Sequence, residues 1–316
     1  MPEPLAKETL FLHNADMGLG TSAWGDRAFW NYGRDYTDDD ICAAFRTCLT
    51  GGVNLVDTAE IYGSGRSEAL LGQFMKTTAQ PILVATKFMP FPWRLGKRTF
   101  QNALQGSLER LGVSKVDLYQ IHWPIPPFPV ETWAEALAEA VKAGWTRAVG
   151  VSNYDKNQMQ RTYTVLSKYD IPLASNQVEY HLLNRKVEIN GLLERCNEMG
   201  VRLIAYSPLA KGLLTGKYSP ATPPPGARGR TSGGSLKEIQ PLIQLMTEIG
   251  TGHGDKTPGQ VAINWVICKG GLPIPGAKTA LQAAENVGAR GWRLTDDEIK
   301  VLEQASDKIT KYSSGD

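Results

Sequence analysis

Four side chains that can exchange or stabilise protons follow three successive apolar segments of the sequence: Asp57, Tyr62, Lys87 and His122. A tyrosine acts as a general acid near neutral pH only if its pKa, about 10 when unperturbed, is lowered, and a nearby ammonium lowers it. Lys87 is the candidate ammonium, and in a desolvated site it would need a carboxylate such as Asp57 to stay charged. His122 would complete a donor site beside the phenol.

Each of these residues also has a purely structural interpretation. Asp57 could cap a turn, and Lys87 could be a surface lysine whose stem packs on apolar atoms. Tyr62 could be a half-buried loop aromatic, and His122 a hydrogen-bonded histidine before Trp123. Four acid–base residues on consecutive strand ends are nevertheless not typical of residues with purely structural roles. A functional site is therefore favoured.

Short apolar segments rich in β-branched residues alternate with longer segments of helical spacing. The predicted strands are residues 53–59, 81–88, 116–124, 145–153, 172–180, 201–210 and 272–278, with an early strand near 16–20. The predicted helices are residues 65–77, 98–111, 131–143, 155–169, 186–199, 236–250 and 258–269. Apolar strands separated by helices indicate a parallel sheet, and eight strands close a barrel. We therefore predict an α/β fold, with residues 1–316 forming a single domain, a (β/α)8 TIM barrel.

The C-terminal strand ends differ chemically from the apolar strand interiors. They carry Asp57, Lys87, His122, Ser152, Asn153, Gln177, Tyr206 and Ser207. Polar side chains at that end of a parallel barrel converge on one mouth, where barrel enzymes place their active sites. After the seventh strand, a long loop includes the Pro/Gly/Ser-rich residues 219–235, which are either a lid or disordered.

Composition argues against several other classes of protein. The sequence has 34 Lys+Arg and 32 Asp+Glu, a formal net charge of +2, so it offers no electrostatic footprint for nucleic acid or for an anionic membrane. Cys42, Cys48, Cys196 and Cys268 are scattered, which favours a reducing, cytoplasmic compartment over a disulfide framework or a metal site. Neither a signal peptide nor a membrane-spanning segment is indicated.

The segments that carry these residues resemble the aldo-keto reductase superfamily. The resembling motifs are residues 57–63 (DTAEIYG), 84–88 (VATKF), 117–124 (DLYQIHWP), 150–154 (GVSNY), 175–180 (SNQVEY), 206–209 (YSPL) and 274–278 (IPGAK). The likeness extends from Gly18 to beyond Asn286. With GLLTGK at 212–217, the chain is most similar to the bacterial and plant-plastid branch, which also resembles the potassium-channel β subunits.

This resemblance implies NADPH-dependent reduction of aldehydes or ketones to alcohols, with hydride passing from the nicotinamide C4 to the carbonyl carbon. Tyr62 would be the proton donor, with its pKa lowered by Lys87 paired to Asp57. His122 would orient the carbonyl, and no metal is implied. The alternative is a slow-turnover NADP(H)-binding sensor or interaction protein of the same fold, which the likeness to channel β subunits allows.

The resemblance also implies a set of cofactor-binding residues at the mouth. In the family, residues matching Ser152, Asn153 and Gln177 hold the nicotinamide amide, and the aromatic matching Tyr206 stacks on its ring. The full predicted set is Gly20, Thr21, Trp24, Asp57, Tyr62, Ser152, Asn153, Gln177, Tyr206, Ser207, Pro208, Leu209, Ala210, Gly212, Lys217, Gly276, Lys278, Gln282, Glu285 and Asn286.

At the far end of the cofactor the chain departs from the best-known members. They carry a Lys-Ser pair after Ile-Pro and an Arg four residues before an Asn, whereas this chain has Gly276 after Ile-Pro and Gln282 four residues before Asn286. Glu285 and Asn286 match the adenine-binding pair. A 2′-phosphate still needs a cation, and Lys278 is the nearest one, so NADPH is predicted over NADH.

Other basic residues have weaker assignments. Lys217 lies where this branch contacts the cofactor pyrophosphate, or else it is a solvated loop charge. Arg228 and Arg230, in the Pro/Gly-rich loop, could close on the phosphates, or the loop could be disordered.

Aromatic residues near the strand ends predict the character of the substrate. Trp24 and Trp123 are the predicted wall residues, with weaker candidates at Phe29, Trp30, Phe91 and Trp93. They suggest an apolar or ring-shaped small-molecule carbonyl compound, although aromatics are also common core material. The oligomeric state is left open.

Overall fold

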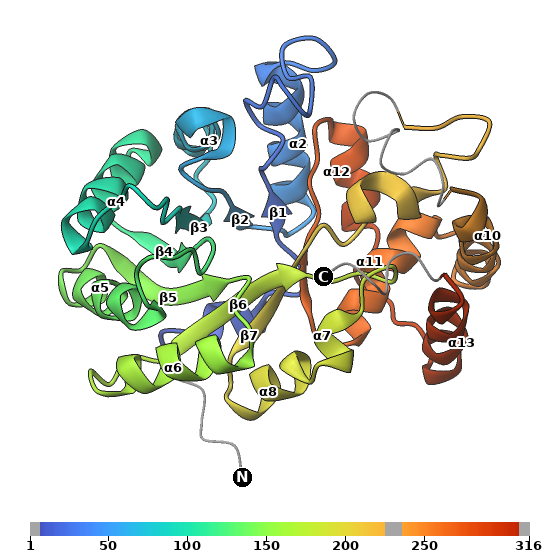
Figure 1. The fold of residues 1–316 in the computed structure, drawn as a ribbon. Coiled ribbons are helices and arrows are strands. Elements are labelled where there is room, and N and C mark those ends of the chain that lie inside the picture. Colours follow the sequence, from blue (N-terminus) through green and yellow to red (C-terminus); the bar gives the residue numbers. More distant parts are fainter. Residues whose placement is uncertain (1–6, 225–235, 310–316) are drawn as a thin grey trace.

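The computed structural model describes residues 7–224 and 236–309, in which eight parallel strands form a barrel with helices outside it (Figure 1). The strands are β1 (Leu19–Gly20), β2 (Leu55–Asp57), β3 (Leu83–Phe88), β4 (Val116–Ile121), β5 (Thr146–Ser152), β6 (Leu173–Glu179), β7 (Arg202–Tyr206) and β8 (Leu272–Ile274). The sheet edges meet where Gly18 N donates to Pro273 O at 2.9 Å and Gly20 N donates to Pro275 O at 3.1 Å. The predicted (β/α)8 barrel is confirmed.

Helices surround the strands and also close one end of the barrel. They are α1 (Leu10–Asn14), α2 (Asp38–Thr50), α3 (Arg66–Met75), α4 (Lys97–Leu111), α5 (Val130–Lys142), α6 (Lys156–Ser167), α7 (Lys186–Ile189), α8 (Leu192–Glu198), α10 (Leu236–Gly252), α11 (Pro258–Cys268), α12 (Ala280–Val287) and α13 (Asp296–Asp307). Two short 3₁₀ segments, η1 (Tyr62–Gly65) and η2 (Ala210–Thr215), follow β2 and β7. No helix in the described ranges is long and apolar enough to cross a bilayer.

Helix α5 illustrates why these segments are helical and where they pack. Its residues Val130, Trp133, Ala134, Leu137 and Ala138 are buried, and they recur at spacings of three and four. That spacing places them on one face of a helix, which the barrel then covers. Figure 1 shows α4, α5 and α6 outside the strands β3 to β6.

Several segments differ from the predicted elements, and among them α1 and α13 are not predicted as helices. The predicted helix 186–199 is two helices, because Gly191 between α7 and α8 has a φ of +72°, which does not continue a right-handed helix. Helix α2 is not among the predicted elements, although Thr37 and Asp40 form a capping box at its start.

The connection between β7 and β8 contains η2, α10 and α11. Of its Pro/Gly/Ser-rich segment, residues 219–224 are described. Arg228 and Arg230 lie outside the described residues, so their predicted role is not tested.

The interior of the barrel is apolar at the N-terminal end and polar at the C-terminal end. Phe11 and Leu12 of α1 pack in a buried cluster with inward-facing strand residues such as Leu55, Leu118 and Ile204. This contact closes the N-terminal end. Alternate residues of a strand share a face, so Gln120, two positions after Leu118, also faces inward. Gln120 lies closer to the mouth of the barrel than Leu118 does.

Candidate active site

A buried ion pair lies at the centre of the candidate active site. Asp57 ends β2 and Lys87 lies in the neighbouring β3. Lys87 Nζ donates to Asp57 Oδ1 at 2.5 Å and to the carbonyl of Thr58 at 2.8 Å, and the Lys87 and Asp57 side chains are 0% and 3% exposed. Burial acts to lower the pKa of Lys87, but attraction to Asp57 opposes burial and the net shift is upward. Lys87 therefore keeps its positive charge.

The phenol of Tyr62 lies beside this ammonium. Tyr62 is half-buried at the start of η1, and its hydroxyl is 3.5 Å from Lys87 Nζ. Burial raises the pKa of Tyr62, Lys87 lowers it, and the net shift is upward. The expected lowering below the ordinary value is therefore not found here, because desolvation of the phenol outweighs the ammonium. Lys87 still favours the phenolate relative to the same burial without a cation.

His122 faces Tyr62 from the residue after β4. The two rings meet edge to face with centroids 5.7 Å apart, and His122 is 8% exposed. Burial, followed by the nearby Lys87 charge, lowers the pKa of His122 to about 3. Its Nδ1 atom is buried without a hydrogen-bond partner in the part of the chain that the structure describes. The imidazole is thus neutral near pH 7 and able to donate one N–H.

A chain of hydrogen bonds joins the ends of β5 and β7. Asn153 Nδ2 donates to the carbonyl of His122 at 3.1 Å and to Ser152 Oγ at 3.0 Å. Tyr206 Oη donates to Asn153 Oδ1 at 3.0 Å. Asn153 has a φ of +62°, a strained conformation of the kind that clusters at functional sites. Residues predicted to hold the nicotinamide therefore meet beside the acid–base group.

Gln177 connects these residues to the ion pair. It lies in β6, is 2% exposed, and donates from Nε2 to Asp57 Oδ2 at 2.8 Å. The backbone carbonyl of Gln177 accepts from Ser152 Oγ at 2.8 Å. The side chain predicted to bind nicotinamide is here a partner of the Asp57 carboxylate.

The segment after β7 has a strained backbone. Ser207, Ala210 and Lys211 all have positive φ values, of 52°, 48° and 56°, followed by Gly212 at 95°. Pro208 is buried and Leu209 half-buried in the same segment. Non-glycine residues with positive φ persist only where the surrounding structure holds them, often at ligand sites.

The exposed Lys217 follows this segment. Its Nζ atom lies 5.4 Å from the centroid of the Tyr218 ring.

Lys278 lies between aromatic rings after β8. Its Nζ atom is 4.6 Å from the Trp30 ring centroid and 4.8 Å from that of Tyr36. Its backbone N–H donates to Gln282 Oε1 at 2.9 Å. Gln282 therefore stabilises the loop that carries Lys278.

The predicted adenine-binding residues are engaged within the fold. Asn286 Nδ2 donates to the carbonyl of Gly276 at 3.2 Å, and Glu285 Oε1 accepts from Thr257 Oγ1 at 3.0 Å. Gly276 itself is exposed. The first contact holds α12 against the loop after β8, and the second holds α12 against the start of α11.

The predicted cofactor-binding and substrate-wall residues at the end of β1 and just after it are mainly buried. A Cβ on Gly20 would lie 2.7 Å from the carbonyl oxygen of Ile274, so glycine permits the close approach that seals the barrel. Thr21 Oγ1 donates to the backbone carbonyl of Asp57 at 3.0 Å. Trp24 is fully buried and donates to the carbonyl of Ala277 at 3.1 Å. Its burial supports a core role rather than the predicted substrate wall.

A family model described as the aldo/keto reductase family matches residues 16–307 of this sequence. The chain belongs to the aldo-keto reductase family. Its predicted family resemblance is confirmed, and it is an oxidoreductase enzyme of this carbonyl-reducing family.

Known proteins of this family resemble the chain over most of its length. A pyridoxal reductase, chloroplastic, from Arabidopsis thaliana is 41% identical over 309 residues, covering 93% of this chain and 84% of that protein. A glycerol dehydrogenase structure from Gluconobacter oxydans matches with a TM-score of 0.82 at 27% identity, covering 93% and 92% of the two chains. An aldo-keto reductase structure from Klebsiella pneumoniae in complex with NADPH matches with a TM-score of 0.75 at 28% identity, covering 95% and 94%.

Sequence reasoning missed two polar residues inside this aldo-keto reductase. Gln120 and Ser175 are both fully buried, and both belong to the hydrogen-bond network around Asp57. The available signal is the alternation along β4, which puts Gln120 on the same face as Leu118 and His122. A buried amide needs a hydrogen-bond partner, so an inward-facing Gln120 indicates a polar network inside the barrel.

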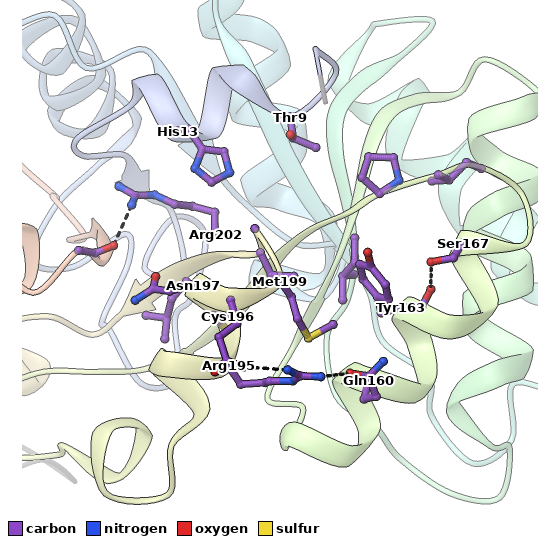
Figure 2. A pocket seen from close by; sticks show the side chains of 18 of the residues that line it. Thr9, His13, Gln160, Tyr163, Ser167, Arg195, Cys196, Asn197, Met199 and Arg202 are labelled. Carbon is purple, nitrogen blue, oxygen red and sulfur yellow. Dashed lines mark hydrogen bonds and ion pairs between the residues drawn. The ribbon is translucent and has the colours of Figure 1, made fainter. Parts of the chain in front are cut away.

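A separate hollow of about 850 Å³ lies at the N-terminal end of the barrel (Figure 2). Figure 2 shows His13 near Arg202, and Arg195 joined to Gln160 on another side. None of the predicted site residues that the structure describes lines it. Because barrel enzymes react at the C-terminal mouth, this hollow is not part of the candidate active site.

Proposed function

We propose that this chain reduces an aldehyde or ketone to an alcohol, with Tyr62 as the proton donor and NADPH as the reductant. The observation that carries this proposal is the position of Lys87 Nζ, which is 2.5 Å from Asp57 Oδ1 and 3.5 Å from the Tyr62 hydroxyl. An ammonium in that position stabilises the phenolate that forms when the phenol gives up its proton. A buried ion pair alone would not require a phenol beside it.

Each residue of the site has a part in this reaction. NADPH, when bound, supplies the hydride that reaches the carbonyl carbon. Tyr62 donates its proton to the carbonyl oxygen, and Lys87 holds a positive charge beside the phenolate that remains. Neutral His122 donates its N–H to the same oxygen and orients the substrate.

Several features of the mouth fit the cofactor. Ser152, Asn153 and Gln177 would hold the nicotinamide amide beside the ring of Tyr206, since all four gather at adjacent strand ends. The strained segment from Ser207 to Gly212 is suited to close approach by the pyrophosphate. Support for NADP(H) also comes from the matching Klebsiella pneumoniae structure, which contains NADPH.

The cationic residues predict which nicotinamide cofactor is preferred. Lys217 would meet the pyrophosphate, and Lys278 would meet the 2′-phosphate. Glu285 and Asn286 would border the adenine.

The proposed substrate class is ring-bearing aldehydes. Trp123 follows His122 directly and is 42% exposed, so its ring is available at the mouth. The similar protein from Arabidopsis thaliana is named as a pyridoxal reductase, and pyridoxal is a ring-bearing aldehyde. Pyridoxal is therefore the first compound to test. That relative is chloroplastic, and a cytoplasmic location for this chain stays a prediction.

The deciding experiment is stopped-flow oxidation of bound NADPH against pyridoxal, other aromatic aldehydes and short-chain aldehydes. Rapid oxidation by ring-bearing aldehydes, abolished in Tyr62→Phe, is the expected result. Oxidation by none of the panel, with NADPH still bound tightly, would favour the sensor or interaction protein instead. Equal rates in the wild type and Tyr62→Phe would contradict the assignment of the proton donor.

A further inference from the structure

The buried carboxamide of Gln120 makes a contact that the proposed reaction leaves unexplained. Gln120 lies in β4, is fully buried, and donates from Nε2 to Asp57 Oδ2 at 3.3 Å. Gln177 Nε2 donates to the same oxygen at 2.8 Å, while Lys87 occupies Asp57 Oδ1. The carboxylate is thus held by an ammonium on one oxygen and by two amides on the other.

The orientation of the Gln120 amide follows from its other neighbours. Ser175 Oγ lies 3.4 Å from Gln120 Oε1, and Gln177 Nε2 lies 3.5 Å from the same atom. Both groups have hydrogens to donate, so the carbonyl end of Gln120 faces them and its N–H end faces Asp57. The flipped amide would place a carbonyl oxygen against a buried carboxylate, which is repulsive.

The barrel leaves room for this amide. Gln120 pairs in register with Gly150 of β5, which pairs with Ser175 of β6. A Cβ on Gly150 would lie 2.2 Å from Ser175 Oγ and 3.2 Å from Gln120 Cγ. Because Gly150 has no side chain, the side chains of Gln120 and Ser175 fit together next to the buried ion pair. These two side chains form a polar layer in the barrel interior.

We propose that Gln120 is a positioning residue that keeps Asp57, and through it Lys87, directed at Tyr62 while Gln177 binds the cofactor. This inference rests on the proposed function. If Gln177 turns to the nicotinamide amide, Asp57 Oδ2 loses its 2.8 Å bond. A buried carboxylate oxygen without a donor is strongly unfavourable, and Gln120 is the donor that remains.

The charged and titratable groups around this carboxylate determine the expected effect. They are Lys87 from β3, Tyr62 from η1 and His122 after β4. The negative charge of Asp57 raises the pKa of Tyr62, against the lowering by Lys87. Without the Gln120 N–H, less of that negative charge is balanced and Asp57 is held less firmly. The phenol should then become a weaker acid.

The main test is Gln120→Met, which keeps the length of the side chain but removes the N–H donor. Tyr62 is titrated in the cofactor-free protein by ultraviolet difference spectra between each protein and its Tyr62→Phe counterpart. We expect the pKa of Tyr62 to rise by about half a unit to one unit and kcat to fall about 10-fold. KM for the aldehyde should stay within about twofold, since Gln120 is buried away from the substrate.

A second measurement concerns the cofactor itself. Of the two amides that hold Asp57 Oδ2 in the described part of the chain, Gln120→Met leaves Gln177, so NADPH binding should weaken about 3- to 10-fold in a fluorescence titration. Ser175→Ala is the matched control, because it alters the same polar layer but leaves both N–H donors on Asp57. That variant should shift the Tyr62 titration less than Gln120→Met does.

Further variants keep the inference falsifiable. If Gln120→Met folds poorly, Gln120→Glu keeps the shape and, when ionised, adds a negative charge, so the pKa of Tyr62 should rise further. A lower melting temperature with unchanged Tyr62 titration and kcat would overturn the inference and leave Gln120 structural. Activity surviving in Tyr62→Phe would overturn the proposed function instead, while the NADPH titrations of Gln120→Met and Ser175→Ala would still decide the role of Gln120.

Discussion

Lys87 Nζ lies 2.5 Å from Asp57 Oδ1, and neither side chain has appreciable exposure to solvent. A buried ion pair is weak as a device for stability, because desolvation of both charges offsets much of their attraction. Lys87 Nζ also lies 3.5 Å from the Tyr62 hydroxyl. In the proposed reaction this position gives the ion pair a function other than stability. Variants of Tyr62, Lys87 and Asp57 can therefore separate the effect on activity from the effect on the free energy of unfolding.

Tyr62→Phe should abolish most carbonyl reduction while leaving cofactor affinity nearly unchanged, because only the proton donor is lost. A general acid is typically worth about 10²–10⁴ in rate. Steady-state kinetics gives kcat, and fluorescence titration gives the NADPH dissociation constant. A kcat within about threefold of the wild type would rule out Tyr62 as the donor.

Lys87→Met should reduce kcat at least as much as Tyr62→Phe, because it removes the charge that favours the phenolate. It also leaves the Asp57 carboxylate buried without its cation, which should lower the free energy of unfolding by about 3–5 kcal/mol. Urea unfolding measures this loss.

The matched control is the double variant with Asp57→Asn, which removes the stranded charge as well. It should recover part of the stability and none of the activity. A normal pH–rate profile in Lys87→Met would count against the role of the ammonium.

Much of the fold and the mouth could be predicted from local features of the sequence. Apolar segments of strand length recur between helical ones, and polar residues such as Lys87 and Gln177 lie near the C-terminal ends of these segments. The positions of strand ends follow from this alternation, because parallel strands around a barrel present their C-terminal ends together. The sequence therefore predicted which side chains share the mouth.

What could not be predicted depends on distances across the barrel. Gln177 contacts Asp57, 120 positions away in the chain. Trp24 is fully buried and donates a hydrogen bond to the carbonyl of Ala277, which is 253 positions away in the chain. The net pKa shift of Tyr62 depends on how much solvent its phenol loses, and the residue types alone do not specify that.

His122 should make the stability of the protein depend on pH. The pKa of His122 is lowered to about 3, chiefly by burial, whereas an unfolded histidine titrates near about 6.5. As the pH falls below 6.5, the unfolded chain binds a proton that the folded chain does not, so stability is lost. Between pH 7 and pH 5 this amounts to about 2 kcal/mol, measurable by urea unfolding at both values.

The His122→Gln variant should lose less stability over that range, because its side chain does not titrate. His13→Gln is the comparison, since the pKa of His13 is also lowered by burial, at the other end of the barrel. If wild type and His122→Gln lose the same stability between pH 7 and pH 5, His122 is not the group responsible.

Lys278 should determine the preference for NADPH over NADH. If the nicotinamide binds at β5 to β7 and the cofactor extends across the mouth, as proposed, the far end of the cofactor would reach the loop after β8. There the ammonium of Lys278 lies over the rings of Trp30 and Tyr36. A charge-assisted hydrogen bond to the 2′-phosphate is worth about 1.5–3 kcal/mol, or about 10- to 150-fold in affinity. Lys278→Ala should weaken NADPH binding by about that factor and leave NADH within about twofold.

The matched control for Lys278 is Lys217→Ala. Both cofactors share the pyrophosphate, so Lys217→Ala should weaken NADPH and NADH alike. Fluorescence titrations at two salt concentrations should also show that Lys278→Ala flattens the salt dependence of NADPH affinity, because a charged contact has been lost. An equal loss of both cofactors in Lys278→Ala would make Lys278 structural, since NADH has no 2′-phosphate for it to bind. Arg228 or Arg230 would then be the candidate partner for that phosphate.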